Sequence, residues 1–403
     1  MSVPVLPNWT VLLLDWELSM QNFEFYNPVR ILFGKGQIAA IAREIPAGAR
    51  ILLTYGGGSI KANGVYDQVK AALAGRPLFE FGGIQPNPRL ETLLRAVELV
   101  RKEGLDFLLA VGGGSVLDGT KFIAAAVHFQ GNPWDIVAKA APVTTAVPLG
   151  AVLTLPATGS EMNCFAVITR WETREKLPFE CPLVYPRFSV LDPETTFSLS
   201  LRQIGNGIVD AFVHTIEQYM TYPVNAPLQD RLAESILQTL IEEGPKTLAH
   251  PRDYDARANL MWCATLALNG LIAAGVPQDW ATHMIGHELT VLHDLDHAQT
   301  LAVVLPALLE VKRDTKRAKL LQYAERVWKI HSGQPEERIS AAIARTRGFF
   351  EQVGLPTRLS AYGVGPDTIL LVADRLQQRG WVGLGERADI TPAQVREILE
   401  RSA

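Results

Sequence analysis

The hydrophobic pattern changes character halfway along the chain. In the first half, short apolar runs rich in β-branched residues alternate with segments of helical periodicity. Four of these runs predict strands, at residues 50–56, 77–83, 106–114 and 150–158. The segment PRLETLLRAVELVRKEG (88–104) repeats apolar positions every three or four residues, which predicts an amphipathic helix. This alternation of strand and helix predicts a mainly parallel sheet with helices on both faces.

The second half reads as helical almost throughout. After FSVLDPETT (188–196) strand signals nearly vanish, and Pro and Gly stand where helices would begin and end. The long helical patterns cover residues 227–249, 254–274, 316–330 and 336–353. The predicted fold class is therefore α/β plus all-α, with a Rossmann-like domain followed by a helical domain. The predicted parts are an N-terminal extension (1–19), an α/β domain (20–196) and an all-helical domain (197–403).

Composition supports two domains and a small-molecule partner. A chain of 403 residues exceeds what one hydrophobic core usually organises. With 48% hydrophobic and 20% charged residues, it has the balance of a globular protein. The formal charge of −4 gives no general attraction to nucleic acid or anionic lipid.

Cysteine usage and the N-terminus bear on the compartment. The three cysteines, Cys164, Cys181 and Cys263, form no CxxC pair, which argues against a disulfide framework or a thiolate metal site and suits a reducing cytoplasm. The N-terminal VLLL run is short and lacks a basic region before it, so we do not interpret it as a signal peptide; Met20 is an alternative start. No stretch reaches the length of a membrane span.

A glycine-rich turn joins a predicted strand to a predicted helix in AVGGGSVLDGTKF (110–122). Gly113 and Gly114 carry no Cβ, so the backbone can approach a ligand closely, and amides at the helix start can hold a diphosphate. Asp118 could accept a hydrogen bond from a ribose hydroxyl. Taken alone, the turn is equally compatible with a purely structural role.

Two further turns follow predicted strands. In LTYGGGSIK (53–61) no carboxylate stands where dinucleotide folds commonly bind the adenosine ribose, which favours NADP over NAD. In LPATGSEMN (155–163) the polar side chains could bond an amide or a ribose. Each of these segments could also be an ordinary surface turn.

Four of the eight histidines fall within HMIGHELTVLHDLDH (283–297). His283 and His287 are four residues apart and share one helical face, as do Asp210 and His214 in VDAFVH. Imidazole nitrogens and a carboxylate suit Zn²⁺ or Fe²⁺ and leave an open position for substrate. An isolated HxxxH is more often structural, but the second pair and His297 favour a metal site.

Single residues of the sequence exclude two familiar zinc-binding motifs. The HExxH motif of zinc proteases would need a histidine where Val291 stands. The GHE of zinc-dependent medium-chain alcohol dehydrogenases would be followed soon by a glycine that is missing after Glu288. His128, His250 and His331 lie outside the two groups of candidate metal ligands, and we interpret them as structural.

The motifs, taken in order, resemble those of the iron-containing, or group III, alcohol dehydrogenases. They are RILFGKG (30–36), TYGGGS (54–59), IQPNP (84–88), AVGGGSVLDGTKF (110–122), TLPATGSE (154–161), VLDP (190–193), NGIVDAFVHTIEQY (206–219) and the 283–297 segment. The likeness is particularly to bacterial NADPH-dependent aldehyde reductases and butanol dehydrogenases, and it covers about 23–398. It implies a dinucleotide-binding domain, a helical metal domain and an active site in the cleft between them.

The resemblance also implies roles for individual residues. The implied metal ligands are Asp210, His214, His283 and His297. His287 is similar to a family histidine near the substrate and is the candidate proton relay, whereas His293 matches no ligand and is expected to be a solvent or packing residue. The implied cofactor contacts are Gly57 and Ser59 at the adenosine ribose or its 2′-phosphate, Asn87, Gly114, Ser115 and Asp118 at the diphosphate and ribose, and Thr154, Asn163 and Lys176 at the nicotinamide end.

The implied activity is reversible, NADPH-dependent reduction of short-chain aldehydes to primary alcohols by a homodimer that uses one Fe²⁺ or Zn²⁺. A lyase of the dehydroquinate synthase type would need a Lys and Arg cluster that is missing around 283–297. A glycerol dehydrogenase is normally an NAD enzyme, which the TYGGGS turn disfavours. Intact ligands argue against a non-catalytic NADP-binding sensor.

Overall fold

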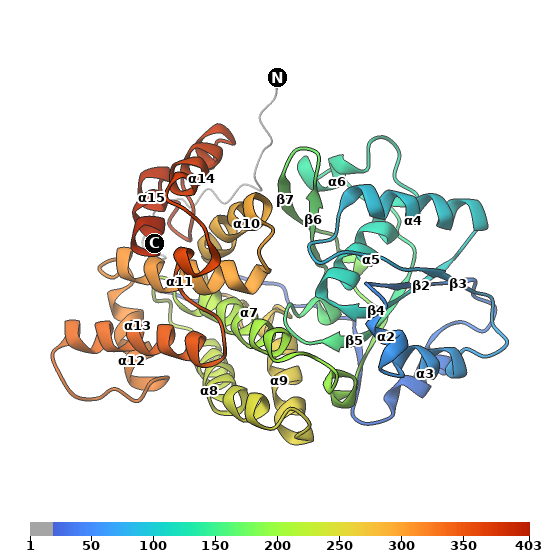
Figure 1. The fold of residues 1–403 in the computed structure, drawn as a ribbon, viewed down its shortest axis with the longest axis horizontal. Coiled ribbons are helices and arrows are strands. Elements are labelled where there is room, and N and C mark those ends of the chain that lie inside the picture. The colour runs from blue at the N-terminus through green and yellow to red at the C-terminus, as the bar shows by residue number, and fades with distance from the viewer. Residues whose placement is uncertain (1–18) are drawn as a thin grey trace. The chain divides into compact units, whose positions relative to one another are not determined.

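A computed structural model describes residues 19–403, so nearly all of the predicted N-terminal extension lies outside the described residues. The chain folds as two compact units. The first comprises residues 26–199, and the second joins residues 19–25 to 200–403. Figure 1 shows the sheet of the first unit and the helices of the second.

The first unit is built on a six-stranded sheet in which every neighbouring pair is parallel. The strand order is β1 (Arg30–Phe33), β8 (Phe188–Leu191), β5 (Leu149–Leu155), β4 (Phe107–Gly113), β2 (Ile51–Tyr55) and β3 (Leu78–Phe81). The four strands predicted from apolar runs are all present. Between most successive strands, a helical segment returns the chain to the end of the sheet where the previous strand began, so the strands run parallel.

Helices cover both faces of this sheet (Figure 1). One face packs against α4 (Leu90–Glu103), α5 (Gly114–Ala126) and α6 (Trp134–Ala138), and the other against α1 (Ile41–Glu44), α2 (Ser59–Ala62) and α3 (Val65–Ala72). Leu52 and Leu108 point into the first layer, while Ile51, Leu53 and Leu109 point into the second. This alternation follows from the two-residue period of a strand, and continuous apolar runs fit a sheet buried on both sides.

The order of the strands reverses at β2. The chain passes from β2 to β3 on one side and then to β4 on the other, so β2 and β4 flank a topological switch point. Tyr55 pairs with Val111, which places the turns after these two strands side by side at the carboxyl edge. The turn after β5 follows at the same edge, because β5 pairs with β4. In open α/β sheets this is where dinucleotides bind.

An antiparallel hairpin of β6 (Phe165–Arg170) and β7 (Glu175–Glu180) packs beside α5. The short 3-10 helices are η1 (Gln37–Ala40), η2 (Ser160–Met162), η3 (Pro182–Val184), η4 (Pro193–Thr196) and, in the second unit, η5 (Leu359–Tyr362).

The second unit is helical. Its helices are α7 (Leu201–Tyr219), α8 (Pro227–Ala249), α9 (Tyr254–Ala267), α10 (Ala281–His293), α11 (His297–Val311), α12 (Arg317–Arg326), α13 (Pro335–Gln352), α14 (Asp367–Gln378) and α15 (Pro392–Arg401). The helix predicted over 254–274 ends early, at Ala267. Asn269 accepts a hydrogen bond from the backbone amide of Leu271, and Gly270 has a φ of 90°, so the chain leaves the helix there.

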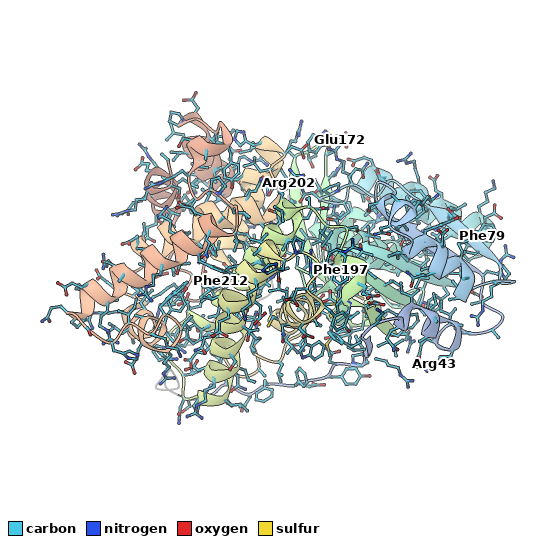
Figure 2. The ribbon with its side chains drawn as sticks, turned by 60° about the horizontal axis from the view of Figure 1, so that its bottom comes forward. Arg43, Phe79, Glu172, Phe197, Arg202 and Phe212 are labelled. Atoms are coloured by element: carbon cyan, nitrogen blue, oxygen red, sulfur yellow. The ribbon has the colours of Figure 1, made fainter. Side chains whose placement is uncertain are left out.

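Helix α7 is the centre of the helical unit. Nearly every residue from Ile204 to its end is buried, and it packs against α8, α9 and α11. Its start is fixed by a capping box between Ser200 and Gln203. Phe212 places its ring 5.5 Å from that of Phe349 and 5.3 Å from that of Phe350 (Figure 2). From Ile204 onward α7 is therefore buried on almost every side, and the polar residues Asp210, His214 and Glu217 are buried with it.

Among the helices that residues 19–403 form, none combines the length and the hydropathy that crossing a bilayer requires.

We expect the close approach at Gly205 of α7 to make this position intolerant of a side chain. A Cβ there would lie 2.3 Å from the carbonyl oxygen of Val353 and 2.9 Å from Leu355 Cδ1. Because the first of these atoms is backbone and cannot move alone, Gly205→Ala should lower the free energy of unfolding by about 1–3 kcal/mol. Thermal unfolding of the metal-free protein measures this loss.

Gly348 of α13 provides the matched control. It is exposed, and a Cβ there would meet nothing within 4 Å, so Gly348→Ala should raise stability by about 0.5–1 kcal/mol through helix propensity. Equal unfolding temperatures for Gly205→Ala and the wild type would contradict the packing described here.

Candidate metal centre and dinucleotide site

Three helices bring the four predicted metal ligands together. Ligand atoms of Asp210, His283 and His297 all lie within 4.8 Å of one another. His297 Nε2 is 3.6 Å from Asp210 Oδ1, and His214 Nδ1 is 3.9 Å from the same oxygen. The His214 ring stacks on that of His283 with centroids 4.6 Å apart. Helix α7 supplies the carboxylate and one imidazole, and α10 and α11 supply one imidazole each.

Local structure explains this convergence. Asp210 and His214 are one turn apart on α7, and His297 is the first residue of α11. A capping box between Asp296 and Gln299 fixes that helix start. Asn206 of α7 donates a hydrogen bond of 2.8 Å to Asp296 Oδ2, so the cap that orients His297 is tied to the helix that carries Asp210.

The residues fit a divalent cation. Asp210 is 3% exposed, and its Oδ1 has no hydrogen-bond partner among residues 19–403. A buried carboxylate oxygen normally requires a hydrogen bond or a positive charge, and here imidazole rings surround it. One carboxylate and three imidazoles are a donor set that Fe²⁺ and Zn²⁺ both accept.

Two other histidines lie on α10. His287 is buried, with its ring centroid 5.3 Å from that of His297 and 6.2 Å from that of His283, so it belongs to the same cluster. Its role as a proton relay stays a prediction. His293, at the end of α10, instead hydrogen-bonds Thr368 Oγ1 at 2.9 Å and packs against α14, and burial lowers its pKa.

Trp280 forms an apolar wall beside the imidazoles. It precedes the first residue of α10 with a φ of 61°, a left-handed conformation that bulky residues rarely adopt. Its ring lies edge-on, 5.3 Å from the His283 ring and 6.1 Å from the His214 ring. Backbone strain of this kind persists only where surrounding contacts enforce it, and it concentrates at functional sites.

Glu217 is a residue of this centre that sequence reasoning missed. Its Oε1 accepts hydrogen bonds from the amides of Thr282 (2.6 Å) and His283 (3.4 Å), and its Oε2 contacts His283 Nδ1. Burial and then the charge of Asp279 raise the pKa of Glu217 to about 8. A signal was present, because Glu217 follows His214 by three residues and therefore shares the ligand face of α7.

A buried ion cluster holds the turn before α10. Lys316 Nζ donates to Asp279 Oδ2 at 2.7 Å and to both oxygens of Glu386 at 2.8 Å. Asp279 Oδ1 accepts the amide of Ala281 at 2.8 Å. Burial opposes ionisation of Asp279, but the charge of Lys316 together with hydrogen bonds from Glu386, Lys316 and the amide of Ala281 outweighs it and lowers the pKa of that carboxyl. Burial and the neighbouring Asp279 raise the pKa of Glu386 to about 7.

The glycines at the carboxyl edge of the sheet divide into two kinds. A Cβ on Gly114 would lie 2.4 Å from Thr158 Oγ1, and one on Gly112 would lie 2.5 Å from Val116 Cγ2, so these two glycines permit close internal packing. A Cβ on Gly57 would meet nothing within 4 Å, so its surroundings are open. Gly113 is the N-cap of α5 and has no side chain to cap the helix, which leaves amides of the first turn available to an anion.

The remaining predicted cofactor residues lie at or near this edge. Ser59 begins α2, Ser115 is the second residue of α5, and Thr154 is buried near the end of β5. Asp118 accepts hydrogen bonds from Ser160 Oγ (2.7 Å) and the amide of Val167 (2.9 Å), so it links α5 to the third turn and to β6. Burial raises the pKa of Asp118. Its predicted bond to a ribose is untested.

The residues predicted at the nicotinamide end are tied to internal partners. Lys176 Nζ donates to Asn87 Oδ1 at 2.9 Å. Asn163 Oδ1 accepts from Lys121 Nζ at 2.8 Å, and Lys121 also donates to the Phe165 carbonyl at 2.8 Å. Burial lowers the pKa of Lys121 to about 8. Lys121 was not predicted, although it lies one helical turn after Asp118.

Comparison with known proteins identifies the family. The family model described as "Iron-containing alcohol dehydrogenase" matches residues 28–193. A second model, "Fe-containing alcohol dehydrogenase family, C-terminal", matches residues 205–403. The chain belongs to the iron-containing alcohol dehydrogenase family. The resemblance inferred from the motifs and the predicted fold class are therefore confirmed.

Individual members of this family match the chain along most of its length. The NADPH-dependent aldehyde reductase YqhD of Escherichia coli K12 is 61% identical over 94% of this chain and 99% of its own. The probable NADH-dependent butanol dehydrogenase 1 of Bacillus subtilis 168 is 42% identical over 95% of this chain and 100% of its own.

Solved structures of family members have the same fold. The crystal structure of E. coli YqhD has a TM-score of 0.95 at 59% identity and covers 96% of this chain and 100% of its own. NADH-dependent butanol dehydrogenase A of Thermotoga maritima has a TM-score of 0.91 at 37% identity over 96% of this chain and 100% of its own.

The raised pKa of Glu386 predicts a pH dependence of stability. Between the ordinary glutamate pKa and about 7, the folded state holds a proton that the unfolded state has lost, so stability falls as pH rises through this window. Glu386→Gln mimics the protonated form, since an amide can donate to Asp279 and accept from Lys316. Its unfolding temperature relative to the wild type should therefore increase from pH 5 to pH 8, a window chosen around that pKa.

Glu397→Gln, at a half-exposed position of α15 paired with Arg401, is the control and should show no such trend. A difference between Glu386→Gln and the wild type that stays flat with pH would contradict the assignment.

Proposed function

We propose that the protein is a metal-dependent, NADPH-dependent aldehyde reductase that converts short-chain aldehydes to primary alcohols and can run in reverse. The observation that carries the proposal is the convergence of Asp210, His214, His283 and His297 around one buried carboxylate oxygen. The 61% identity to a protein named as an NADPH-dependent aldehyde reductase supports the same reaction class.

In this proposal the four residues hold one divalent metal ion. The family name favours Fe²⁺, and Zn²⁺ suits the same donors. Bound there, the ion supplies Lewis acidity toward the aldehyde oxygen. Trp280 excludes water from the imidazole cluster, and the capped start of α11 keeps His297 directed at Asp210.

The residues of the sheet unit bind the cofactor. The amides at the start of α5 receive the diphosphate, and the open space at Gly57 admits the adenosine ribose with its 2′-phosphate. The turn at 56–59 carries no carboxylate to repel that phosphate. The two relatives reported above differ in the cofactor of their names, so this turn is the basis for proposing NADPH.

A proton is needed once hydride has reached the carbonyl carbon. His287 is proposed to supply it to the product oxygen from a ring nitrogen, because imidazole titrates near neutral pH and this ring lies within the cluster.

We also propose a homodimer in the cytoplasm. The family resemblance supports the dimer, and three buried, free cysteines suit a reducing compartment.

Steady-state oxidation of NADPH and, separately, NADH with a panel of short aliphatic aldehydes tests the proposed function. The enzyme is stripped of metal and then reconstituted with Fe²⁺ or Zn²⁺. We expect turnover that depends on metal, with the larger kcat/KM for NADPH. Equal or better use of NADH would refute the role given to the 56–59 turn. Bound metal without turnover of any aldehyde would refute the proposed activity.

Substitutions separate the two roles proposed for histidines of α10. His283→Ala should abolish metal binding. His287→Ala should keep one metal per chain and lower kcat by about 10²- to 10⁴-fold through loss of proton transfer. Metal content by mass spectrometry and rates across pH measure these effects. His293→Ala, on the same helix but bonded to Thr368, is the control for both. Wild-type turnover by His287→Ala across pH would exclude it as the relay.

A further inference from the structure

A second carboxylate lies behind one of the proposed metal ligands. Glu217 is 2% exposed, and it contacts the Nδ1 side of the His283 ring through Oε2. Its other oxygen, Oε1, accepts the amides of Thr282 and His283. Its backbone carbonyl accepts the amide of Asp279 at 2.8 Å. Glu217 of α7 thus binds the residue Asp279 before α10 and the first turn of α10.

The contact with the ring has a chemical consequence for His283. A neutral imidazole carries its proton on one nitrogen and a lone pair on the other, and only the lone pair binds a metal. The ionised form of Glu217 can only accept a hydrogen bond, so it favours the tautomer of His283 with the proton on Nδ1, which leaves the lone pair on Nε2. Carboxylates commonly orient metal-binding histidines in this way.

We propose that Glu217 is a positioning residue of the metal centre, which holds His283 in the Nδ1–H tautomer and thereby sets the affinity for the divalent ion. This inference rests on the metal site of the proposed function. It assigns to Glu217 no contact with substrate or metal.

Helix α7 carries most of the residues that fix the geometry of the site. Asp210, His214 and Glu217 share one face of this helix, so two ligands and the support of a third are fixed by a single rigid element. Trp280, the N-cap of α10, accepts no amide through its side chain. Asp279 accepts the amide of Ala281, and the carboxylate of Glu217 accepts those of Thr282 and His283. The same carboxylate therefore fixes both the start of α10 and the ring of His283.

Glu217→Gln separates these two tasks. The amide oxygen can still accept the backbone amides of α10, so the helix start is retained. The amide nitrogen is then placed against His283 Nδ1 as a donor, which favours the Nε2–H tautomer and removes the lone pair from the ligating nitrogen. We expect the Kd for Zn²⁺, measured by competition with a chelator, to rise about 10- to 100-fold.

The metal-free unfolding temperature provides the second readout. It should change little in Glu217→Gln if the cap is kept. Glu234→Gln, which alters another buried carboxyl of the helical unit bonded to Tyr219 Oη at 3.0 Å, is the matched control and should leave the Kd for Zn²⁺ unchanged. A purely structural role for Glu217 predicts the opposite pattern, with lost metal-free stability and unchanged affinity per folded chain, and that result would overturn the inference.

A measurement on the wild type tests the tautomer of His283 directly. Long-range ¹H–¹⁵N correlation spectra of the metal-free protein, recorded above the raised pKa of Glu217 so that its carboxylate is ionised, report the tautomer of each imidazole, and the His283 signal is assigned by its loss in His283→Ala. We expect the Nδ1–H form, and an Nε2–H form would refute the proposal. Failure of the wild type to bind Zn²⁺ or Fe²⁺ would count against the metal site itself, whereas equal affinity in the wild type and Glu217→Gln would count only against the role of Glu217.

Discussion

The helical unit is organised around the charge of Asp210. A carboxylate buried among imidazoles is costly unless a cation or hydrogen bonds compensate it, and one of its oxygens has no hydrogen-bond partner among residues 19–403. Asp210 lies on α7, the most buried helix of the unit, and α10 and α11 place His283 and His297 beside it. The Asp296 cap and the Lys316 cluster are understandable as supports for that convergence, because each fixes the start of a ligand helix.

The sheet unit has two requirements at its carboxyl edge. The backbone of the turns must come close to a ligand, and the same turns must pack tightly against neighbouring side chains. Gly112 and Gly114 meet the second requirement, since a Cβ on either would collide with Val116 or Thr158. Gly57 has open surroundings and meets the first. Glycines that look alike in the sequence therefore have different reasons to be glycine, and only the neighbours of each position distinguish them.

Much of this organisation was predictable because it follows from local rules. Short apolar runs predicted the buried strands, the three-to-four-residue period predicted the long helices, and the fold class followed from their order. The early end of α9 at Ala267 was missed because helical periodicity continues past a turn that Asn269 and Gly270 impose. The ligand set was inferred from Asp210, His214, His283 and His297 together with a family resemblance. Glu217 was missed although its spacing from His214 places it on the ligand face of α7, and Lys316 was missed because partners far apart in sequence give no periodic signal.

Trp280 limits how the apolar wall of the metal centre can evolve or be redesigned. A left-handed non-glycine residue stores on the order of 1–3 kcal/mol of backbone strain. Glycine at this position would release the strain but remove the wall, and a β-branched residue would add strain without restoring the ring. Backbone and side chain thus make opposite demands at one position, and few residue types satisfy both. Positions within the regular part of α10 carry no such backbone demand and therefore accept a wider range of side chains than Trp280 does.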